Sequence, residues 1–459
     1  MVENGQNSDI SDFSQCESNI SAEAERFITL SAPVTLQWEV TPWCNEKCIH
    51  CYNYWRQDQN IKPTPTSETV NVWDKTVSEI IKNKVFHITA TGGEPLAVFK
   101  PLYPFLEKLV EGGVGVGINT NLTMMNAEIA RSLKKIGIKS ILTSLSSSDL
   151  ELNDKISGRK NTLKDITRGI KIAQNEGLWV AVNMVVTKKN LHDIYETAKY
   201  VKSLGIKNFS ATKASAPIRD IDFSDYALSK SEFNFMLEEL LRVKENLGLS
   251  VDSLEFYPTC AMQTQNQIDS FGGRMCSAGK TSCTIGFDGS IRPCSHAIQV
   301  YGSILNSDGL SEGWQKLQPW RVTSEFLPDK CNDCKVKTLC RGGCRTEAYV
   351  FAGSLMADDP YSDFLSIPLE RKAIEFPVIN KNDNFYFNPG VRYRSESFGA
   401  ILFSTSSKWT PVDSKLYNFF EQRKSDFCLG ELGVALGASA EAVLPTVQVL
   451  LRNKIIERR

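Results

Sequence analysis

Short apolar runs alternate with longer amphipathic stretches from Val34 to about residue 255. Runs such as VTLQWEV, VFHITATGG and WVAVNMVVT have the length and the β-branched content of buried strands. Between them, stretches such as TVNVWDKTVSEIIKN carry apolar residues at helical spacing. Strand and helix in regular alternation are typical of an α/β fold with a parallel sheet. We therefore predict a parallel barrel, or part of one, with functional residues at the C-terminal ends of its strands.

The rest of the chain follows other patterns. Residues 1–30 are rich in Ser, Asn, Asp and Glu and predict a flexible tail. After the α/β repeat of residues 31–255, residues 256–372 contain frequent cysteines between Gly, Pro and Asp turns, which indicates a small domain held by metal. Residues 373–459 open with strand-like runs and close with three helix-like runs, so we expect a third compact module there.

Composition narrows the function classes. Of 459 residues, 52 are Lys or Arg and 53 are Asp or Glu, so no positive excess predicts binding to nucleic acid or to an anionic membrane surface. No apolar run is long enough for a membrane span and the polar N-terminus lacks a secretory signal, so we expect a cytoplasmic protein. Thiols stay reduced in the cytoplasm, and the 13 cysteines are therefore candidate metal ligands rather than disulfides.

Three cysteines stand close together directly after the first predicted strand. Cys44, Cys48 and Cys51 lie in CNEKCIHC, a C-x3-C-x2-C spacing on a loop at the strand's C-terminal end. Three thiolates would leave one iron of a 4Fe–4S cluster without a protein ligand, which makes that iron a reaction site. The spacing alone also fits a zinc site with His50 as the fourth ligand, or unrelated buried thiols.

A glycine pair follows the next strand. In ITATGGEPLAVF, Gly92 and Gly93 end a strand, and Glu94 and Pro95 lead into a helix, so backbone groups there can approach a bound ligand closely. Together with the cysteine spacing, this loop resembles the radical S-adenosylmethionine (SAM) family, whose C-x3-C-x2-C motif has an aromatic residue, here His50, before its last cysteine.

The resemblance covers residues 34 to 250 and implies a partial (βα)6 TIM-like barrel. It implies a 4Fe–4S cluster on the three cysteines, whose open iron is chelated by SAM and which generates a 5′-deoxyadenosyl radical. Two departures from the family pattern are Leu122 in Thr120-Asn121-Leu122, where many relatives have Gly, and Ser157 before Gly158, where the usual residue is Arg. The cofactor-binding residues that the resemblance implies are Gly92, Gly93, Glu94, Pro95 and Ser144, with Arg159 as the substitute for the missing arginine.

A second group of cysteines follows the barrel, in CSAGKTSCTIGFDGSIRPC and CNDCKVKTLCRGGC. A structural zinc ribbon is the alternative on spacing alone. On a radical SAM core, the pattern resembles the SPASM extension, which carries auxiliary 4Fe–4S clusters. The resemblance implies one auxiliary cluster on Cys276, Cys294 and Cys344, with Cys283 or Cys260 as the fourth ligand, and a second on Cys331, Cys334 and Cys340.

The second auxiliary cluster lacks its expected last cysteine. In the Asp-Pro-x-Cys context of the family, this chain has Ser362 after Asp359-Pro360-Tyr361. The cluster would then use an oxygen ligand such as Asp363 or Asp359, keep an open iron, or be absent; the sequence leaves these alternatives open.

The last module, from about residue 385, resembles the peptide-recognition domain related to the pyrroloquinoline quinone biosynthesis chaperone, a small winged-helix-like fold. A packing or dimerisation domain of winged-helix type is the alternative. In the resembling systems, an extended leader peptide adds as a strand to an exposed sheet edge.

These features together predict a radical SAM/SPASM maturase that modifies a ribosomally made precursor peptide, forming a thioether or a carbon–carbon crosslink. The implied partners are the precursor peptide, with its leader on the C-terminal module, and a flavodoxin- or ferredoxin-type reductant. An anaerobic sulfatase-maturating enzyme is one alternative, although Ser295 and His296 follow Cys294 where an aspartate base is usual. A zinc-stabilised binding or regulatory protein is another.

Overall fold

The computed structural model describes residues 29–53, 55, 62–217, 222–364, 376–380, 382–406, 408–423 and 425–459. The chain divides into two compact units, Ala32–Ala373 and a second that comprises Ile374–Arg459 together with the start of the chain up to Ser31. The predicted tail, apart from residues 29 and 30, lies outside the described residues. The boundary that we placed after residue 255 stays a prediction, and each unit is described by itself below.

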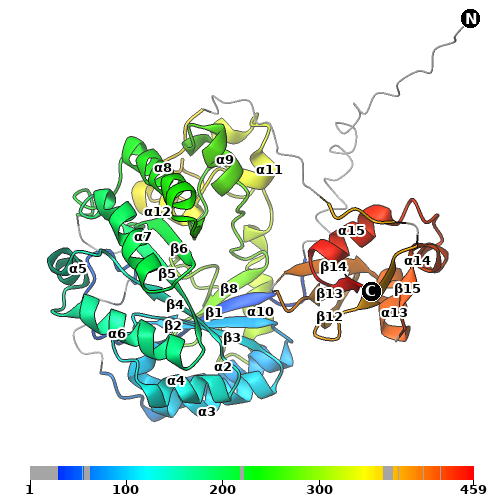
Figure 1. The fold of residues 1–459 in the computed structure, drawn as a ribbon, viewed down its shortest axis with the longest axis horizontal. Coiled ribbons are helices and arrows are strands. Elements are labelled where there is room, and N and C mark those ends of the chain that lie inside the picture. Colours follow the sequence, from blue (N-terminus) through cyan, green and yellow to red (C-terminus); the bar gives the residue numbers. More distant parts are fainter. Residues whose placement is uncertain are drawn as a thin grey trace, which may run out of the picture. The chain divides into compact units, whose positions relative to one another are not determined.

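The first unit is built on one ten-stranded sheet with the order β10-β9-β8-β1-β2-β3-β4-β5-β6-β7 (Figure 1). All neighbours from β8 through β1 to β7 pair in parallel, whereas β9 and β10 pair antiparallel. The strands are β1 (Thr35–Thr41), β2 (His87–Gly92), β3 (Gly115–Thr120), β4 (Ser140–Ser144), β5 (Trp179–Val186), β6 (Asn208–Lys213), β7 (Ser250–Asp252), β8 (Ser282–Ile285), β9 (Ser290–Arg292) and β10 (Gly302–Ser303).

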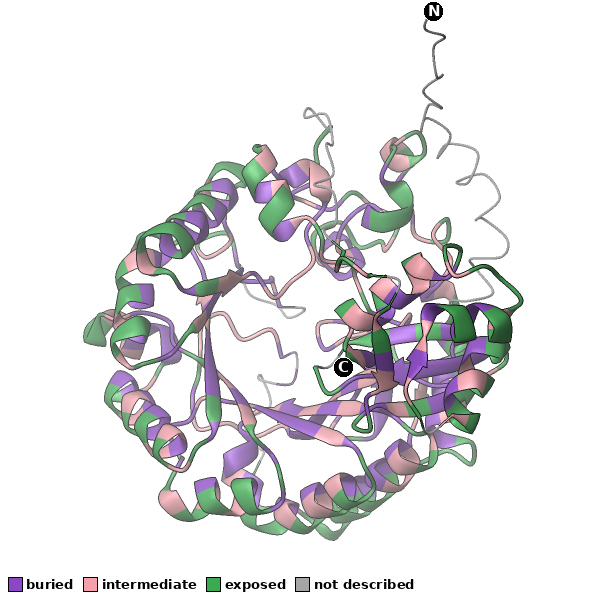
Figure 2. Ribbon diagram, turned by 45° about the vertical axis from the view of Figure 1, so that its right-hand side comes forward, coloured by how far each residue is buried: buried purple, intermediate pink, exposed green. Residues whose placement is uncertain are grey.

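Helices follow each of the first six strands and ring the outside of the sheet (Figure 2). These six strand–helix units confirm the predicted partial barrel. The barrel helices are α2 (Ser67–Lys82), α3 (Phe99–Glu111), α4 (Ala127–Lys135), α5 (Leu150–Ser157), α6 (Thr162–Asn175), α7 (Ile194–Ser203) and α8 (Lys230–Leu247). The cysteine-rich part adds α9 (Gln265–Phe271), α10 (Gly309–Lys316), α11 (Lys337–Cys340) and α12 (Arg345–Ala352). Short 3₁₀ helices occur along the whole unit: η2 (Pro95–Val98), η3 (Leu191–Asp193), η4 (Thr259–Ala261), η5 (Gln318–Trp320) and η6 (Asp329–Cys331).

Two tryptophans fix the first strand to the first helix. Trp38 on β1 and Trp73 on α2 are fully buried, and their rings meet edge to face with centroids 6.5 Å apart. The indole N–H of Trp73 also donates to the carbonyl of Val40, at 2.9 Å. This packing holds the C-terminal end of β1, from which the CNEKCIHC loop leaves.

The described residues of the second unit form two three-stranded antiparallel sheets and three helices, in keeping with the expected small winged-helix-like module. The sheet orders are β15-β11-β16 and β12-β13-β14, and apolar residues such as Phe385, Leu402 and Val447 form its core. Its elements are β11 (Asn384–Phe387), β12 (Arg392–Glu396), β13 (Gly399–Phe403), β14 (Trp409–Asp413), α13 (Ser414–Gln422), β15 (Phe427–Cys428), α14 (Leu429–Leu436), α15 (Leu444–Arg452) and β16 (Ile456–Arg458). Within the described part of the chain, no helix is long and apolar enough to cross a membrane.

Candidate active site

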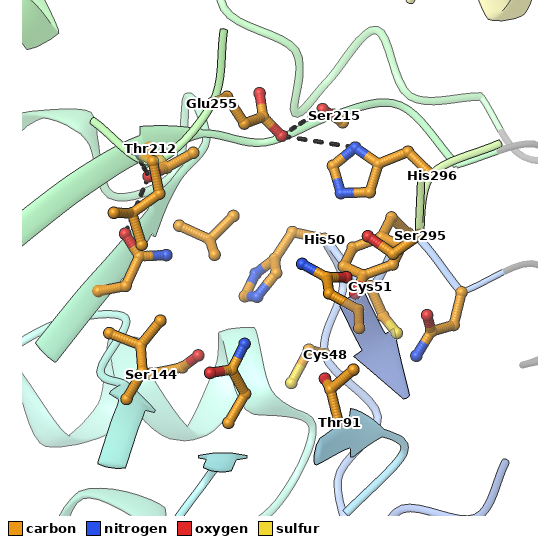
Figure 3. A pocket seen from close by; sticks show the side chains of 18 of the residues that line it. Cys48, His50, Cys51, Thr91, Ser144, Thr212, Ser215, Glu255, Ser295 and His296 are labelled. Carbon is orange, nitrogen blue, oxygen red and sulfur yellow. Dashed lines mark hydrogen bonds and ion pairs between the residues drawn. The ribbon is translucent and has the colours of Figure 1, made fainter. Parts of the chain in front are cut away.

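A cavity of about 620 Å³ opens at the C-terminal ends of the barrel strands, where functional residues were expected (Figure 3). The last residues of β2, β3, β4 and β6 all belong to its wall. The cavity therefore brings together residues from across the first unit. The predicted site residues in its lining are Cys44, Cys48, Cys51, Gly92, Gly93, Glu94, Ser144, Cys276, Cys294 and Cys344.

Several other predicted residues lie outside this lining. The guanidinium of Arg159 forms an ion pair with Asp165 at 2.6 Å, and its side chain is 32% exposed. Pro95 is buried at the start of η2, and Cys283 is buried on β8. Cys331, Cys334 and Cys340 lie on the segment that contains η6 and α11.

The CNEKCIHC loop is pinned to the end of α5 by two backbone hydrogen bonds. Lys47 N–H donates to the Ser157 carbonyl at 2.8 Å, and Ile49 N–H donates to the Ile156 carbonyl at 3.0 Å. A Cβ at Gly158 would lie 2.8 Å from the Lys47 carbonyl oxygen, so this close approach requires glycine. The Ser157-Gly158 pair, which departs from the family pattern at Ser157, thus contributes its backbone to the shape of the cysteine loop.

The three loop thiols lie close enough to repel one another when charged. Burial raises the pKa of Cys48 well above its usual value, and the charges of Glu46, Cys51 and Cys44 raise it further. A bound cation would reverse this effect because its positive charge stabilises the thiolate form. Thiolates are the preferred ligands of iron–sulfur clusters. In the described part of the chain, no three His, Cys, Asp or Glu side chains converge as a single metal ion requires. The three thiols of the loop are the residue type that holds an iron–sulfur cluster.

The Gly92-Gly93 turn lies directly against the strand that carries this loop. Gly93 N–H donates to the Thr41 carbonyl and Glu94 N–H donates to the Trp43 carbonyl, both at 2.7 Å. Gly92 has a φ of 119°, which side chains rarely adopt. A Cβ at Gly93 would lie closer than 3.0 Å to the Trp43 carbonyl oxygen. Both glycines are therefore required by geometry.

The Gly93→Ala variant is expected to bind SAM at least tenfold more weakly, a loss of about 1.4 kcal/mol, and to lose about 1–3 kcal/mol of stability. The new methyl group would clash with the Trp43 carbonyl, and the backbone at Trp43 leads directly into the cysteine loop. Equilibrium dialysis with labelled SAM and urea unfolding measure the two effects. Gly273→Ala is the matched control because a Cβ there meets nothing within 4 Å. Equal SAM affinity in both variants would contradict the prediction.

The carboxylate of Glu94 connects the glycine turn with the loop after β3. It accepts hydrogen bonds from the Thr120 hydroxyl at 2.6 Å, Asn121 N–H at 2.8 Å and Leu96 N–H at 2.9 Å. Burial raises the pKa of Glu94, and these three donors lower it. The Asn121 amide also donates to the Asn45 side chain at 2.8 Å, so Glu94 helps to position the cysteine loop.

Leu122, which departs from the family pattern, lies on the same loop, directly after Asn121. Leu122 has a φ of 56°, a left-handed conformation that favours glycine. A leucine thus adopts a conformation here for which glycine is usual, and its side chain is fully buried.

The opposite wall carries charged groups that the sequence analysis did not single out. Lys213, at the end of β6, is 3% exposed and forms ion pairs with Glu347 at 3.1 Å and Glu255 at 3.5 Å. Burial alone would lower the pKa of Lys213, but these carboxylates raise it well above its usual value. Glu255 also accepts a hydrogen bond from Ser215 at 2.7 Å and lies 3.6 Å from Nδ1 of His296 (Figure 3).

The thiols of Cys276, Cys294 and Cys344 lie in the same cavity. Burial raises the pKa of Cys344 well above its usual value, and the charges of Glu347, Asp359, Cys276 and Cys294 raise it further. Cys294 approaches the Thr346 hydroxyl, with Sγ and Oγ1 3.7 Å apart. These three thiols therefore form a second group of neighbours, distinct from the one at the end of β1.

The family comparison agrees with the barrel and the cysteine loop. Residues 38–201 match the model of the Radical SAM superfamily. These residues therefore form a radical SAM domain, and the cofactors of such a domain are SAM and a 4Fe–4S cluster.

Among named relatives, the chain is 24% identical to the AdoMet-dependent heme synthase of Nitratidesulfovibrio vulgaris, over 72% of this chain and 92% of that protein. It is 26% identical to the mycofactocin maturase MftC of Mycolicibacterium smegmatis, over 72% of this chain and 83% of that protein. Among solved structures, Streptococcus suis SuiB bound to precursor peptide SuiA matches with a TM-score of 0.56 and 19% identity, over 78% of this chain and 83% of SuiB. Native anSMEcpe with bound AdoMet matches with a TM-score of 0.55 and 18% identity, over 71% and 94%. At these identities the structures support the fold.

Proposed function

We propose that this protein is a maturase that modifies a ribosomally made precursor peptide and forms a thioether or a carbon–carbon crosslink. The observation that carries the proposal is the second unit, a small winged-helix-like module attached to a radical SAM barrel. The relatives support it, since MftC is a maturase and SuiB has been solved with its precursor peptide. A heme synthase is a weaker candidate. The match to 72% of this chain already takes up 92% of that relative, so the rest of the relative is too short to hold a counterpart of the second unit.

In this proposal, Cys44, Cys48 and Cys51 hold the catalytic cluster, and Cys276, Cys294 and Cys344 hold an auxiliary one. The turn Gly92–Pro95 and Ser144 contact SAM, and a contact of Arg159 with SAM stays a prediction, since one nitrogen of its guanidinium pairs with Asp165. When bound, SAM and the cluster supply a 5′-deoxyadenosyl radical that abstracts a hydrogen atom from the substrate. Lys213 and Glu255, which line the cavity, orient the peptide by hydrogen bonding to its polar groups, while the buried Glu347 holds Lys213 in place.

Two alternatives from the sequence are disfavoured. A zinc-stabilised regulator does not fit the radical SAM class. A sulfatase-maturating enzyme would use an aspartate after Cys294, whereas this chain has Ser295, followed by a His296 that faces Glu255. A flavodoxin or ferredoxin is the proposed reductant, and a cytoplasmic location stays a prediction.

The leader peptide is proposed to add to β14, an edge strand of the β12-β13-β14 sheet. Ser404 N–H donates to the Lys408 carbonyl at 2.8 Å, so in an antiparallel ladder the backbone groups of Trp409, Pro411 and Asp413 point away from β13. Pro411 is tolerated there because its missing N–H lies on the open side. The end of α15 lies beside β14, since Asn453 donates to Thr410 at 2.9 Å.

Trp409→Pro is expected to bind the precursor about tenfold more weakly than Trp409→Ala, a difference of about 1.4 kcal/mol. Both variants lack the indole, but only proline removes the N–H that points away from β13. Fluorescence anisotropy with peptides encoded by short reading frames beside the gene measures the difference, with the full-length protein. Equal affinity of the two variants would rule out strand addition at this position.

The same peptides test the proposed reaction. The protein, loaded with iron and sulfide under anaerobic conditions, is incubated with dithionite, SAM and each peptide. We expect 5′-deoxyadenosine to form and one peptide to lose the mass of two hydrogen atoms, as crosslink formation requires. If 5′-deoxyadenosine forms but every peptide keeps its mass, the radical SAM class stands and the maturase proposal fails.

A further inference from the structure

The segment around Ser362 raises the question of what replaces the missing cysteine of the second auxiliary cluster. Ser362 is buried, and its hydroxyl donates to the Asp359 carbonyl at 2.6 Å. The side chain of Asp359 accepts from the backbone N–H groups of Cys344 and Tyr361, at 2.7 and 2.8 Å. Both oxygen groups are thus engaged in holding their own turn, which disfavours them as iron ligands.

A thiol from elsewhere in the sequence lies against this turn. Cys260, on η4, accepts a hydrogen bond at its Sγ from the Asp363 N–H, at 3.3 Å. The turn is held in place from the other side, because the Tyr361 hydroxyl donates to the Leu228 carbonyl at 2.8 Å. Sγ of Cys260 therefore lies beside the position where the family has a cysteine.

Two of the three predicted ligands of this cluster, Cys331 and Cys340, lie close to Cys260, and the third, Cys334, lies close to Cys331. Cys334 N–H donates to the Cys331 carbonyl at 3.1 Å, which closes one turn over both residues. Cys340 is buried at the end of α11, and its Sγ accepts hydrogen bonds from Thr259, the neighbour of Cys260 in the chain. Burial raises the pKa of Cys260 to about 11, and among the groups that raise it further are the thiols of Cys340 and Cys331.

Cys331 lies near both of the other predicted ligands, Cys334 and Cys340. Burial raises the pKa of Cys331, and the charges of Cys340 and Cys334 raise it further. Each of the four thiols therefore has at least one other as an electrostatic neighbour. Four cysteine thiolates are the complete ligand set of a 4Fe–4S cluster.

The other candidate for a fourth ligand, Cys283, lies in a different environment. It is 1% exposed in the middle of β8, where Leu36 of β1 is its parallel neighbour. Burial raises the pKa of Cys283 to about 12, and the charged group beside it is Arg321. That guanidinium donates to the carbonyls of Gly279 and Trp314, so Cys283 belongs to the packing of the sheet.

We propose that Cys260 completes a four-thiolate site with Cys331, Cys334 and Cys340, and takes over the ligand position that Ser362 vacates. Cys276, Cys294 and Cys344 then form a three-thiolate site, all of whose members line the cavity. The inference rests on the proposed function only in requiring auxiliary clusters; it does not depend on the peptide substrate.

The test starts from a parent protein with Cys44, Cys48 and Cys51 all replaced by Ala, so that auxiliary clusters alone bind iron. After anaerobic reconstitution, we expect about eight iron atoms per chain in this parent. Adding Cys260→Ala is expected to remove about one to four iron atoms and to change the EPR spectrum of the reduced protein. Cys283→Ala is the matched control, a buried thiol whose loss should change neither readout.

A rescue variant separates loss of a ligand from misfolding. Because Ser362 lies on the turn that contacts Cys260, Cys260→Ala with Ser362→Cys should recover the iron content of the parent. Unchanged iron and EPR signals in Cys260→Ala, iron loss in Cys283→Ala instead, or no recovery in the double variant would each overturn the assignment. A parent that binds no iron would overturn the auxiliary clusters of the proposed function as well.

Discussion

The variant with Cys44, Cys48 and Cys51 all replaced by Ala is expected to form no 5′-deoxyadenosine above the background without enzyme. These thiols share one loop and lie close enough to repel one another when charged. Without them the catalytic cluster has no protein ligand, and the one-electron reduction of SAM has no donor. The measurement is 5′-deoxyadenosine by chromatography after anaerobic reconstitution, with dithionite and SAM.

The matched control is Cys428→Ala. Cys428 lies in the second unit, at the start of α14, and is half-buried. Its product yield should equal that of the wild type, because the substitution is outside the first unit. Residual 5′-deoxyadenosine in the triple variant at more than a few per cent of wild type would refute the assignment of these cysteines.

The Glu39→Ala variant is expected to lose about 3–5 kcal/mol of stability. Glu39 on β1 and Arg292 on β9 form an ion pair in which both side chains are at most 1% exposed. Burial raises the pKa of Glu39 to about 7 even though the Arg292 guanidinium lowers it. Removal of the carboxylate leaves the guanidinium buried without its counter-charge, which is the costly case for a buried pair.

The same variant is expected to disturb the proposed auxiliary site. Arg292 donates to the carbonyls of Ser295 and Ala297, at 3.2 and 2.8 Å, and so holds the loop that follows Cys294. Urea unfolding gives the change in stability, and iron analysis gives the change in cluster content. Glu39→Gln keeps a hydrogen-bond acceptor for Arg292 and should lose less. If Glu39→Ala unfolds at the same urea concentration as wild type, the pair carries no net stability.

The local parts of the site followed from the sequence, because their residues are close together in the chain. The spacing of Cys44, Cys48 and Cys51 and the Gly92-Gly93 turn each need only one strand and the loop after it. The six strand–helix units likewise depend on hydrophobic periodicity over short windows.

Contacts between residues far apart in the chain could not be predicted from the sequence. The parallel pairing of β8 with β1 joins residues almost 250 positions apart, and no local pattern encodes it. The ion pairs among Lys213, Glu255 and Glu347 come from three separate segments, and a single charged residue in each gives no periodic signal. The neighbourhood of Cys260 was missed for the same reason, since it forms only when η4 meets the turn at Ser362.

The pairing of β1 also has a thermodynamic consequence. β1 lies between β2 and β8, so the strand that ends at the catalytic loop is hydrogen-bonded to the strand that begins the hairpin before Cys294. A cluster bound at either end stabilises this shared strand, and the order that it imposes lowers the free energy needed to organise the other end. If both clusters bind as proposed, linkage predicts that the second cluster binds more tightly than it would alone, so that the two loading steps are positively cooperative.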